Sequence, residues 1–187
     1  MDRSNSEACS GLDATSASMG RNASSVEQAN ASGHYVVECV RDGEVVWTDT
    51  IENLVTTAGK NDALDKYLAG SAYTAAWYLG LIDSTSYSAV AVGDTSASHS
   101  GWTENTGYTQ GARPTTAWSA ASAGSKALSS ALTFSINANA TVKGCFLISN
   151  STKGGTTGIL YSAGLFTGGD KVVQNGDTLN VSYTASL

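Results

Sequence analysis

The two histidines, His34 and His99, are the residues through which this chain could perform serine-type hydrolysis, because a Ser-His-Asp triad needs an imidazole as its base. Neither is accompanied by the Gly-x-Ser-x-Gly motif that presents the nucleophile in many hydrolases. His34 opens a β-branched run, and His99 lies in a polar stretch. We expect structural or solvent-exposed roles for both and predict no catalytic residue of this class.

Three carboxylates, Asp83, Asp94 and Glu104, lie in or beside the same polar stretch. Two carboxylates about 5–10 Å apart can hydrolyse a glycosidic bond, and carboxylates combined with carbonyl oxygens can bind Ca²⁺. The stretch has neither the spacing of an EF-hand nor a Gly-Asp repeat. The sequence therefore favours solvated loop residues over an active site or a metal site, and we expect no enzymatic activity.

Signals for a cofactor or for nucleic acid are also missing. Residues 153–158 are rich in glycine, but a Walker A loop needs Gly-Lys-Ser/Thr entering a helix, and here a strand follows. The chain has 10 Lys and Arg against 16 Asp and Glu, with no basic run that could track a phosphate backbone. We expect no cofactor and no direct contact with nucleic acid.

The three cysteines, Cys9, Cys39 and Cys145, are far apart and lack CxxC or Cys/His spacing. This pattern predicts free thiols rather than a metal centre or a disulfide framework. No apolar run approaches the roughly 20 residues of a membrane span, and the polar start lacks the apolar core of a signal peptide. We expect a chain that is made in the cytoplasm and does not contact a membrane.

Trp102, Tyr108 and Trp118, together with Arg113, are the residues best suited to molecular recognition. Aromatic side chains and Arg are enriched at the centres of protein interfaces, so these four are candidate interface residues. Two alternatives stay open: the group could cover the end of a β domain, or its rings could stack on a sugar, as in a lectin-like module.

The elements that must position these residues are mostly β-strands. Residues 34–49 contain two β-branched runs around Asp42-Gly43, a dipeptide typical of a tight hairpin turn. Residues 75–82 are nearly all apolar, which predicts a central strand buried on both faces, with Gly80 at a close approach or a bulge. Further strands are predicted at 87–92, 116–119, 128–136, 142–149, 159–166 and 177–185, with glycine turns at Gly154-Gly155, Gly168-Gly169 and Asn175-Gly176.

Residues 56–70 contain the one helix that the pattern predicts. Thr57 is its expected N-cap, and Gly70 stands where a left-handed C-terminal residue belongs. Leu64, Tyr67 and Leu68 share one face. We expect this face to close one end of the β core.

Short strands, glycine turns and one helix predict a mainly β fold, an antiparallel β-sandwich of jelly-roll type, over residues 34–187. Residues 1–33 form instead an extended polar arm of Ser, Ala and Asn, in which Leu12, Met19 and Val26 are candidate contact residues. An arm of this composition cannot bury enough surface to offset its ordering entropy. We expect a neighbouring protein to hold it, which indicates a component of a large assembly.

Several segments of the chain, taken together, resemble small virion proteins of tailed phages, and the similarity covers residues 45–187. The segments are Asn53-Leu54-Val55, Gly59-Lys60-Asn61, Leu64, Leu68-Ala69-Gly70, Trp77-Tyr78-Leu79-Gly80-Leu81-Ile82-Asp83, Gly101-Trp102-Thr103-Glu104, Tyr108, Arg113, Trp118, Asn175-Gly176-Asp177-Thr178-Leu179 and Val181-Ser182-Tyr183-Thr184. The apolar segment that begins at Trp77 and the Gly-Trp-Thr-Glu segment are unusual together.

This resemblance implies a jelly-roll decoration (cement) protein on the outer surface of the capsid in the virion. Its partners would be the major capsid protein and further copies of the chain, as a dimer or trimer. The family has no catalytic motif, and residues 1–33 are an addition to its pattern that could lie across capsid subunits or exchange between copies. The alternative is a receptor- or glycan-binding module of a tail or head fibre.

Overall fold

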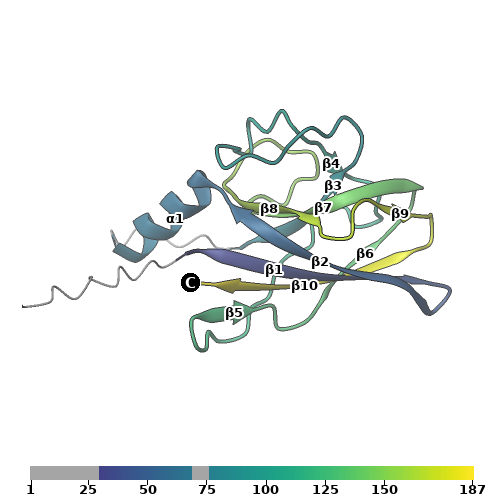
Figure 1. Ribbon diagram of the computed structural model, residues 1–187, viewed down its shortest axis with the longest axis horizontal. Coiled ribbons are helices and arrows are strands. Elements are labelled where there is room, and N and C mark those ends of the chain that lie inside the picture. Colours follow the sequence, from purple (N-terminus) through teal and green to yellow (C-terminus); the bar gives the residue numbers. More distant parts are fainter. Residues whose placement is uncertain (1–29, 69–75) are drawn as a thin grey trace, which may run out of the picture.

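Figure 1 shows the computed structural model of the chain, which describes residues 30–68 and 76–187. These residues form ten strands in one antiparallel sheet and one helix, so the predicted mainly β fold is confirmed. The elements are β1 (Ser32–Arg41), β2 (Glu44–Val55), α1 (Thr57–Leu68), β3 (Tyr78–Asp83), β4 (Glu104–Asn105), β5 (Ser125–Ala127), β6 (Leu132–Ser135), β7 (Ala140–Ile148), β8 (Leu160–Phe166), β9 (Lys171–Val173) and β10 (Thr178–Ser186).

The sheet has the strand order β4-β3-β7-β8-β2-β1-β10-β5, with β6 beside β10 and β9 beside β7. It curls, so that side chains from both halves meet in one core. Leu79 and Cys145 from one half share this core with Tyr35, Val37 and Val181 from the other. The packing is that of a β-sandwich, in which the inward-facing residues of antiparallel strands interdigitate.

Residues 104–119 link the two edges of the curled sheet. The first two of these residues form β4 against β3. Isolated bridges then pair Tyr108 with Ile136, Thr115 with Tyr78 and Trp118 with Leu128. The segment therefore contacts the β3 edge twice and reaches the edge formed by β5 and β6 twice.

A second apolar cluster lies on the opposite face of β3, β7 and β8. Ile82, Phe146 and Leu160 belong to it, and Trp102 reaches it from the long loop between β3 and β4. Because this loop covers the outer face, β3 is buried on both faces, as its apolar run predicts. A Cβ on Gly80 would collide with the ring of Phe146, so the predicted close approach is confirmed.

The predicted hairpin is formed by β1 and β2, which pair in antiparallel register. Asp42 and Gly43 at its turn have φ angles of 52° and 85°. Positive φ at both central residues is the type I′ arrangement, whose twist matches that of the flanking strands. The three predicted glycine turns are also present, with positive φ at Gly154, Gly169 and Gly176.

The helix α1 is attached to the β domain by its first turn. Its N-cap is Thr56 rather than the predicted Thr57, because Oγ1 of Thr56 accepts a hydrogen bond of 3.0 Å from the amide of Gly59. Gly59 is the buried residue of this helix and lies against the backbone of Tyr161 in β8. The predicted packing of the apolar face on the core is wrong, because Leu64, Tyr67 and Leu68 are exposed.

Three other predictions about strands need correction. Residues 87–92 form no strand, because they belong to the loop over the second cluster. Residues 116–119 form no strand, and among them only Trp118 makes an isolated bridge, to Leu128, as the segment crosses between the two edges. The strand predicted at 128–136 is reduced to the four-residue β6, and the short strands β4, β5 and β9 were not predicted.

The β domain begins at Ser32, two residues before the predicted boundary at His34. Residues 1–29, which make up most of the predicted arm, lie outside the described residues, and so do its candidate contact residues Leu12, Met19 and Val26.

Replacing Gly59 with Ala tests how α1 is attached. Helix propensity alone favours Ala over Gly by about 1 kcal/mol. We expect the opposite result, a loss of about 1–3 kcal/mol in the free energy of unfolding, because the new Cβ would collide with the backbone of Tyr161. Urea denaturation measures this difference. Gly93→Ala is the control, since no atom lies within 4 Å of its Cβ position; a stabilised Gly59→Ala variant would contradict the described attachment.

Candidate functional site

A buried ion pair between Glu104 and Arg113 is the most strongly organised polar group in the described residues. Glu104 lies in β4, and Arg113 lies near the end of the stretch that returns to β3. Nε and Nη2 of Arg113 donate to the two carboxylate oxygens of Glu104 at 2.9 and 2.8 Å. The two side chains are 3% and 5% exposed, so the pair is almost fully removed from water.

The remaining polar atoms of this pair bind the loop between β7 and β8. Nη1 of Arg113 donates to the carbonyl of Asn150 at 2.9 Å, and Nη2 also donates to the carbonyl of Gly155 at 3.2 Å. Glu104 accepts a further hydrogen bond from the amide of Gly154. A buried ion pair is stable only when such additional bonds satisfy both partners, and that condition is met here.

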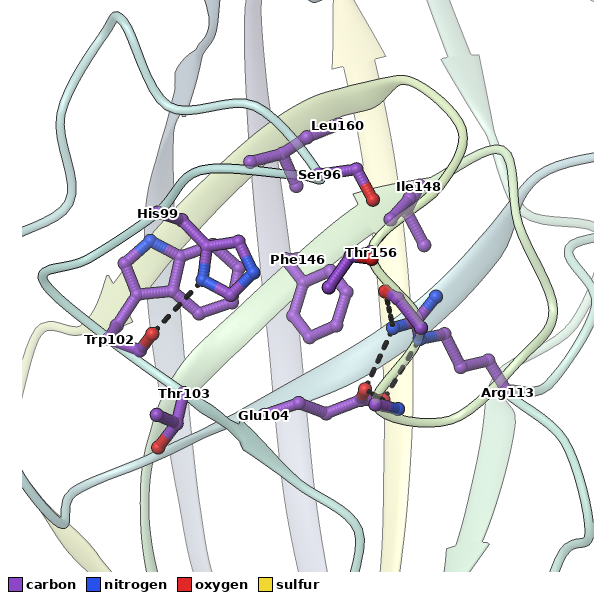
Figure 2. Close-up of a pocket in the computed structure, with 12 residues that line it drawn as sticks. Ser96, His99, Trp102, Thr103, Glu104, Arg113, Phe146, Ile148, Thr156 and Leu160 are labelled. Atoms are coloured by element: carbon purple, nitrogen blue, oxygen red, sulfur yellow. Dashed lines mark hydrogen bonds and ion pairs between the residues drawn. The ribbon is translucent and has the colours of Figure 1, made fainter.

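A pocket of about 250 Å³ lies beside the ion pair (Figure 2). Trp102, Phe146, Ile148 and Leu160 supply its apolar wall, and His99 stacks on Trp102 with 4.1 Å between ring centroids. The pocket therefore has the mixed lining of a small-molecule site. Its polar groups are already engaged, because Glu104 and Arg113 bind each other and the neighbouring loop.

The other residues with chemical potential are used in the same structural way. Nδ1 of His99 lies 3.0 Å from the carbonyl of Trp102, and Oδ2 of Asp94 accepts from the indole nitrogen of Trp102 at 2.9 Å. The expectation that these carboxylates are solvated is wrong for Asp94 and Glu104, which are buried. Asp94 binds Trp102 within the loop that covers the second cluster, and Glu104 binds Arg113 and the loop between β7 and β8. His34 lies far along the chain on β1 and pairs with Glu52 at the surface.

Asp83 is likewise bound to its neighbours. Burial alone would raise the pKa of this carboxyl, but hydrogen bonds from Thr85 and Asn105 outweigh it and hold the pKa below its ordinary value. Asp83 thus remains a charged acceptor that fixes the turn after β3.

The four aromatic and Arg candidates do not form one cluster. Trp102 packs on Phe146, Tyr108 packs on Phe134, and Trp118 packs on Tyr183. Trp102, Tyr108 and Arg113 are 1–3% exposed, so they lack the free surface that an interface or a sugar-stacking platform needs. Trp118 is half-buried. The alternative, that these residues cover the β domain, is the one that the geometry supports.

The exposed apolar surface lies instead on α1. Leu64, Tyr67 and Leu68 are 55%, 84% and 73% exposed, and the C-terminal Leu187 is 79% exposed. In Figure 1, α1 projects at the same end of the molecule as the start of β1 and the end of β10. A groove of about 370 Å³ is lined by residues of these three places together with β8: Asn30, Ala31, Lys60, Ala63, Leu64, Tyr67, Tyr161 and Leu187.

This apolar end differs from the rest of the described surface. The other exposed large apolar residues lie on β1, β2, the covering loop and β9: Val36, Val45, Val46, Leu54, Val92 and Val172. Single exposed apolar residues are normal on soluble proteins, whereas a contiguous group marks a contact site. The i, i+3, i+4 spacing did identify the apolar face of α1, although it could not say that the face points away from the core.

The two described cysteines, Cys39 and Cys145, are free and buried. Burial raises the pKa of Cys39 to about 12, with the nearby carboxylate of Asp177 adding to the effect. Burial also raises the pKa of Cys145 well above its ordinary value. Both therefore remain protonated at neutral pH, where a thiol is a poor nucleophile.

Residues 30–68 and 76–187 contain no group of three His, Cys, Asp or Glu side chains placed to hold a metal ion. No helix in these ranges has the length and apolar character needed to span a membrane. Comparison with models of known protein families and with curated protein sequences gives no match.

Replacing Arg113 with Met tests the structural importance of the ion pair. The carboxylate of Glu104 would stay buried without its cation, so we expect a loss of about 3–5 kcal/mol in the free energy of unfolding, measured by urea denaturation. Adding Glu104→Gln removes the orphaned charge and should recover part of this loss. The control Lys143→Met breaks a partly exposed ion pair with Asp170 and should change stability by at most about 1 kcal/mol. Equal effects of Arg113→Met and Lys143→Met would contradict the assignment.

Proposed function

We propose that this chain is a decoration protein of a tailed phage, which binds the outer surface of the assembled head and stabilises it. The single observation that carries the proposal is the projecting apolar face of α1, with Leu64, Tyr67 and Leu68 open to solvent at one end of a well-packed β domain. The resemblance of residues 45–187 to tailed-phage virion proteins supplies the kind of partner.

The exposed face has the chemistry of a protein-binding surface. Tyrosine is one of the residue types enriched among the side chains that supply most of the binding energy at interfaces, and the two leucines beside Tyr67 add apolar area. Burying one such side chain contributes about 1.5–3 kcal/mol. Leaving three of them in water is unfavourable for a monomer in isolation, so a partner that covers them is the simplest explanation.

The rest of the domain suits a stabilising role. Two ion pairs are each made through two hydrogen bonds: Arg41 with Asp177, which are 136 residues apart, and Arg113 with Glu104 in the buried site. A rigid domain loses little conformational entropy on docking. Binding to the assembled shell alone then stabilises that shell by mass action.

In this proposal the partners are the major capsid protein and neighbouring copies of the chain, as a dimer or trimer, and the location is the outer surface of the virion. The fibre-module alternative predicts an exposed aromatic platform for a glycan. The burial of Trp102 and Tyr108 removes that platform, so we favour the shell-binding role.

The test uses phage heads that lack this protein and measures how many copies of the purified chain they bind. We expect saturable binding in many copies and greater resistance of the heads to heat. Leu68→Lys should weaken binding about ten- to hundredfold, because it removes an exposed apolar anchor while keeping the helix C-terminus electrostatically favourable.

Val172→Lys is the matched control, since Val172 is 62% exposed on β9, away from α1 in Figure 1. Heads that bind none of the chain, or that bind it in only a handful of copies, would refute the decoration role. Equal weakening by the two variants would refute the assignment of the docking face to α1.

A further inference from the structure

The pocket beside the buried ion pair lies where two loops meet the outer face of the sheet. Phe146, Ile148 and Leu160 from β7 and β8 form its most deeply buried side, and each is at most 2% exposed. The loop between β3 and β4 adds Trp102, and the loop between β7 and β8 adds Thr156, which is exposed. The pocket therefore leads from solvent to a buried apolar surface.

The volume of this pocket, about 250 Å³, suits one small molecule. An apolar cavity of about 150 Å³ holds one benzene molecule, so an aromatic ring with a substituent fits here. The rings of Trp102 and Phe146 lie 5.1 Å apart between centroids and are tilted by 49° (Figure 2). Aromatic rings prefer such tilted or offset contacts, and a third ring that enters the pocket can contact both side chains.

The ion pair determines the charge of the molecule that the pocket accepts. Glu104 and Arg113 bind each other through two hydrogen bonds, and both also bind the neighbouring loop. Their charges cancel, so a charged ligand would lose its hydration without gaining an unpaired partner. The indole N–H of Trp102 is engaged by Asp94, so this side chain offers only its ring. These contacts favour a neutral ligand.

Ser96 supplies a buried hydrogen-bond acceptor in the same pocket. This residue is 3% exposed and belongs to the lining (Figure 2). Its Oγ donates its only proton to the carbonyl of Thr157 at 2.8 Å. A hydroxyl oxygen that has donated its proton still has lone pairs with which it accepts. A ligand that carries an O–H or N–H group can therefore be recognised at this oxygen.

We infer that the pocket binds a small neutral aromatic molecule with one hydrogen-bond donor, of the size of a substituted phenol. Its ring lies against Trp102 and Phe146, and its donor binds Oγ of Ser96. Such a molecule enters between the two loops, whereas a glycan would need ring faces that are open at the surface. The inference goes beyond the proposed function and does not rest on it, because the pocket contains no residue of α1.

Titration of the full chain with phenol, toluene or benzoate, followed by the amide shifts in ¹H–¹⁵N NMR spectra, tests this site. We expect saturable shifts at Ser96, Trp102 and Thr156 with phenol, and binding of benzoate about tenfold weaker because its carboxylate must be desolvated. Ser96→Ala should weaken phenol about three- to tenfold and leave toluene unchanged, since only phenol donates a hydrogen bond. A purely structural role of Ser96 would instead weaken both ligands equally.

A second variant tests the position of the site without altering its buried lining. Thr156→Trp narrows the exposed rim and should weaken phenol and toluene at least about tenfold. Thr106→Trp is the matched control, since Thr106 is also exposed but does not line the pocket, and it should leave binding unchanged.

Three results would overturn the inference. The first is the absence of any saturable shift with phenol. The second is a set of shifts confined to α1 and Tyr161, which would place the ring in the other groove. The third is an equal loss of phenol and toluene binding in Ser96→Ala, which would remove the assigned hydrogen bond.

Discussion

The ion pair between Glu104 and Arg113 is the interaction on which the closure of this fold depends. Glu104 lies in the short strand β4. Arg113 lies two residues before Thr115, which bridges to β3, and it also binds the loop between β7 and β8. These pieces have little regular structure of their own, and 37 residues separate Arg113 from Asn150 in the β7–β8 loop. One guanidinium and one carboxylate together satisfy three backbone groups of the β7–β8 loop, the carbonyls of Asn150 and Gly155 and the amide of Gly154.

With that closure in place, the sheet acquires two cores. The inner core is made by alternating residues of strands on both halves of the sheet, and the outer core lies between β7 and a polar loop. The loop is polar in sequence, and it is held by one large side chain: Trp102 packs on Phe146, and its indole nitrogen donates to Asp94. A single tryptophan with a satisfied N–H can thus order a long segment that lacks regular secondary structure.

The parts of this structure that are visible in the sequence are those set by local interactions. Asp42-Gly43 specifies its own turn, and β7, β8 and β10 were placed to within two residues by their apolar runs and glycine turns. The missed features depend on distant partners. Residues 116–119 form one isolated bridge rather than a strand because they cross between two edges, and β9 pairs with the β7 strand that extends beside it.

The candidate site shows the same division. The type and spacing of Leu64, Tyr67 and Leu68 revealed an apolar helix face, but its direction is set by Gly59, whose missing side chain lets the first turn lie against Tyr161. The residue types of Trp102, Tyr108 and Arg113 are as common at protein interfaces as in places where they are buried, so the types alone do not say which role these residues have. Their burial follows from partners such as Phe134 and Glu104, whose proximity no sequence spacing encodes.

The enclosed thiols of Cys39 and Cys145 have a consequence for the lifetime of the domain. Oxidants and other thiols reach a cysteine only through its exposed, ionised form, and neither side chain offers one. The described part of the chain therefore keeps the same covalent structure in reducing and in oxidising surroundings. A domain of this kind can fold in one compartment and persist in the other without a change in its bonds.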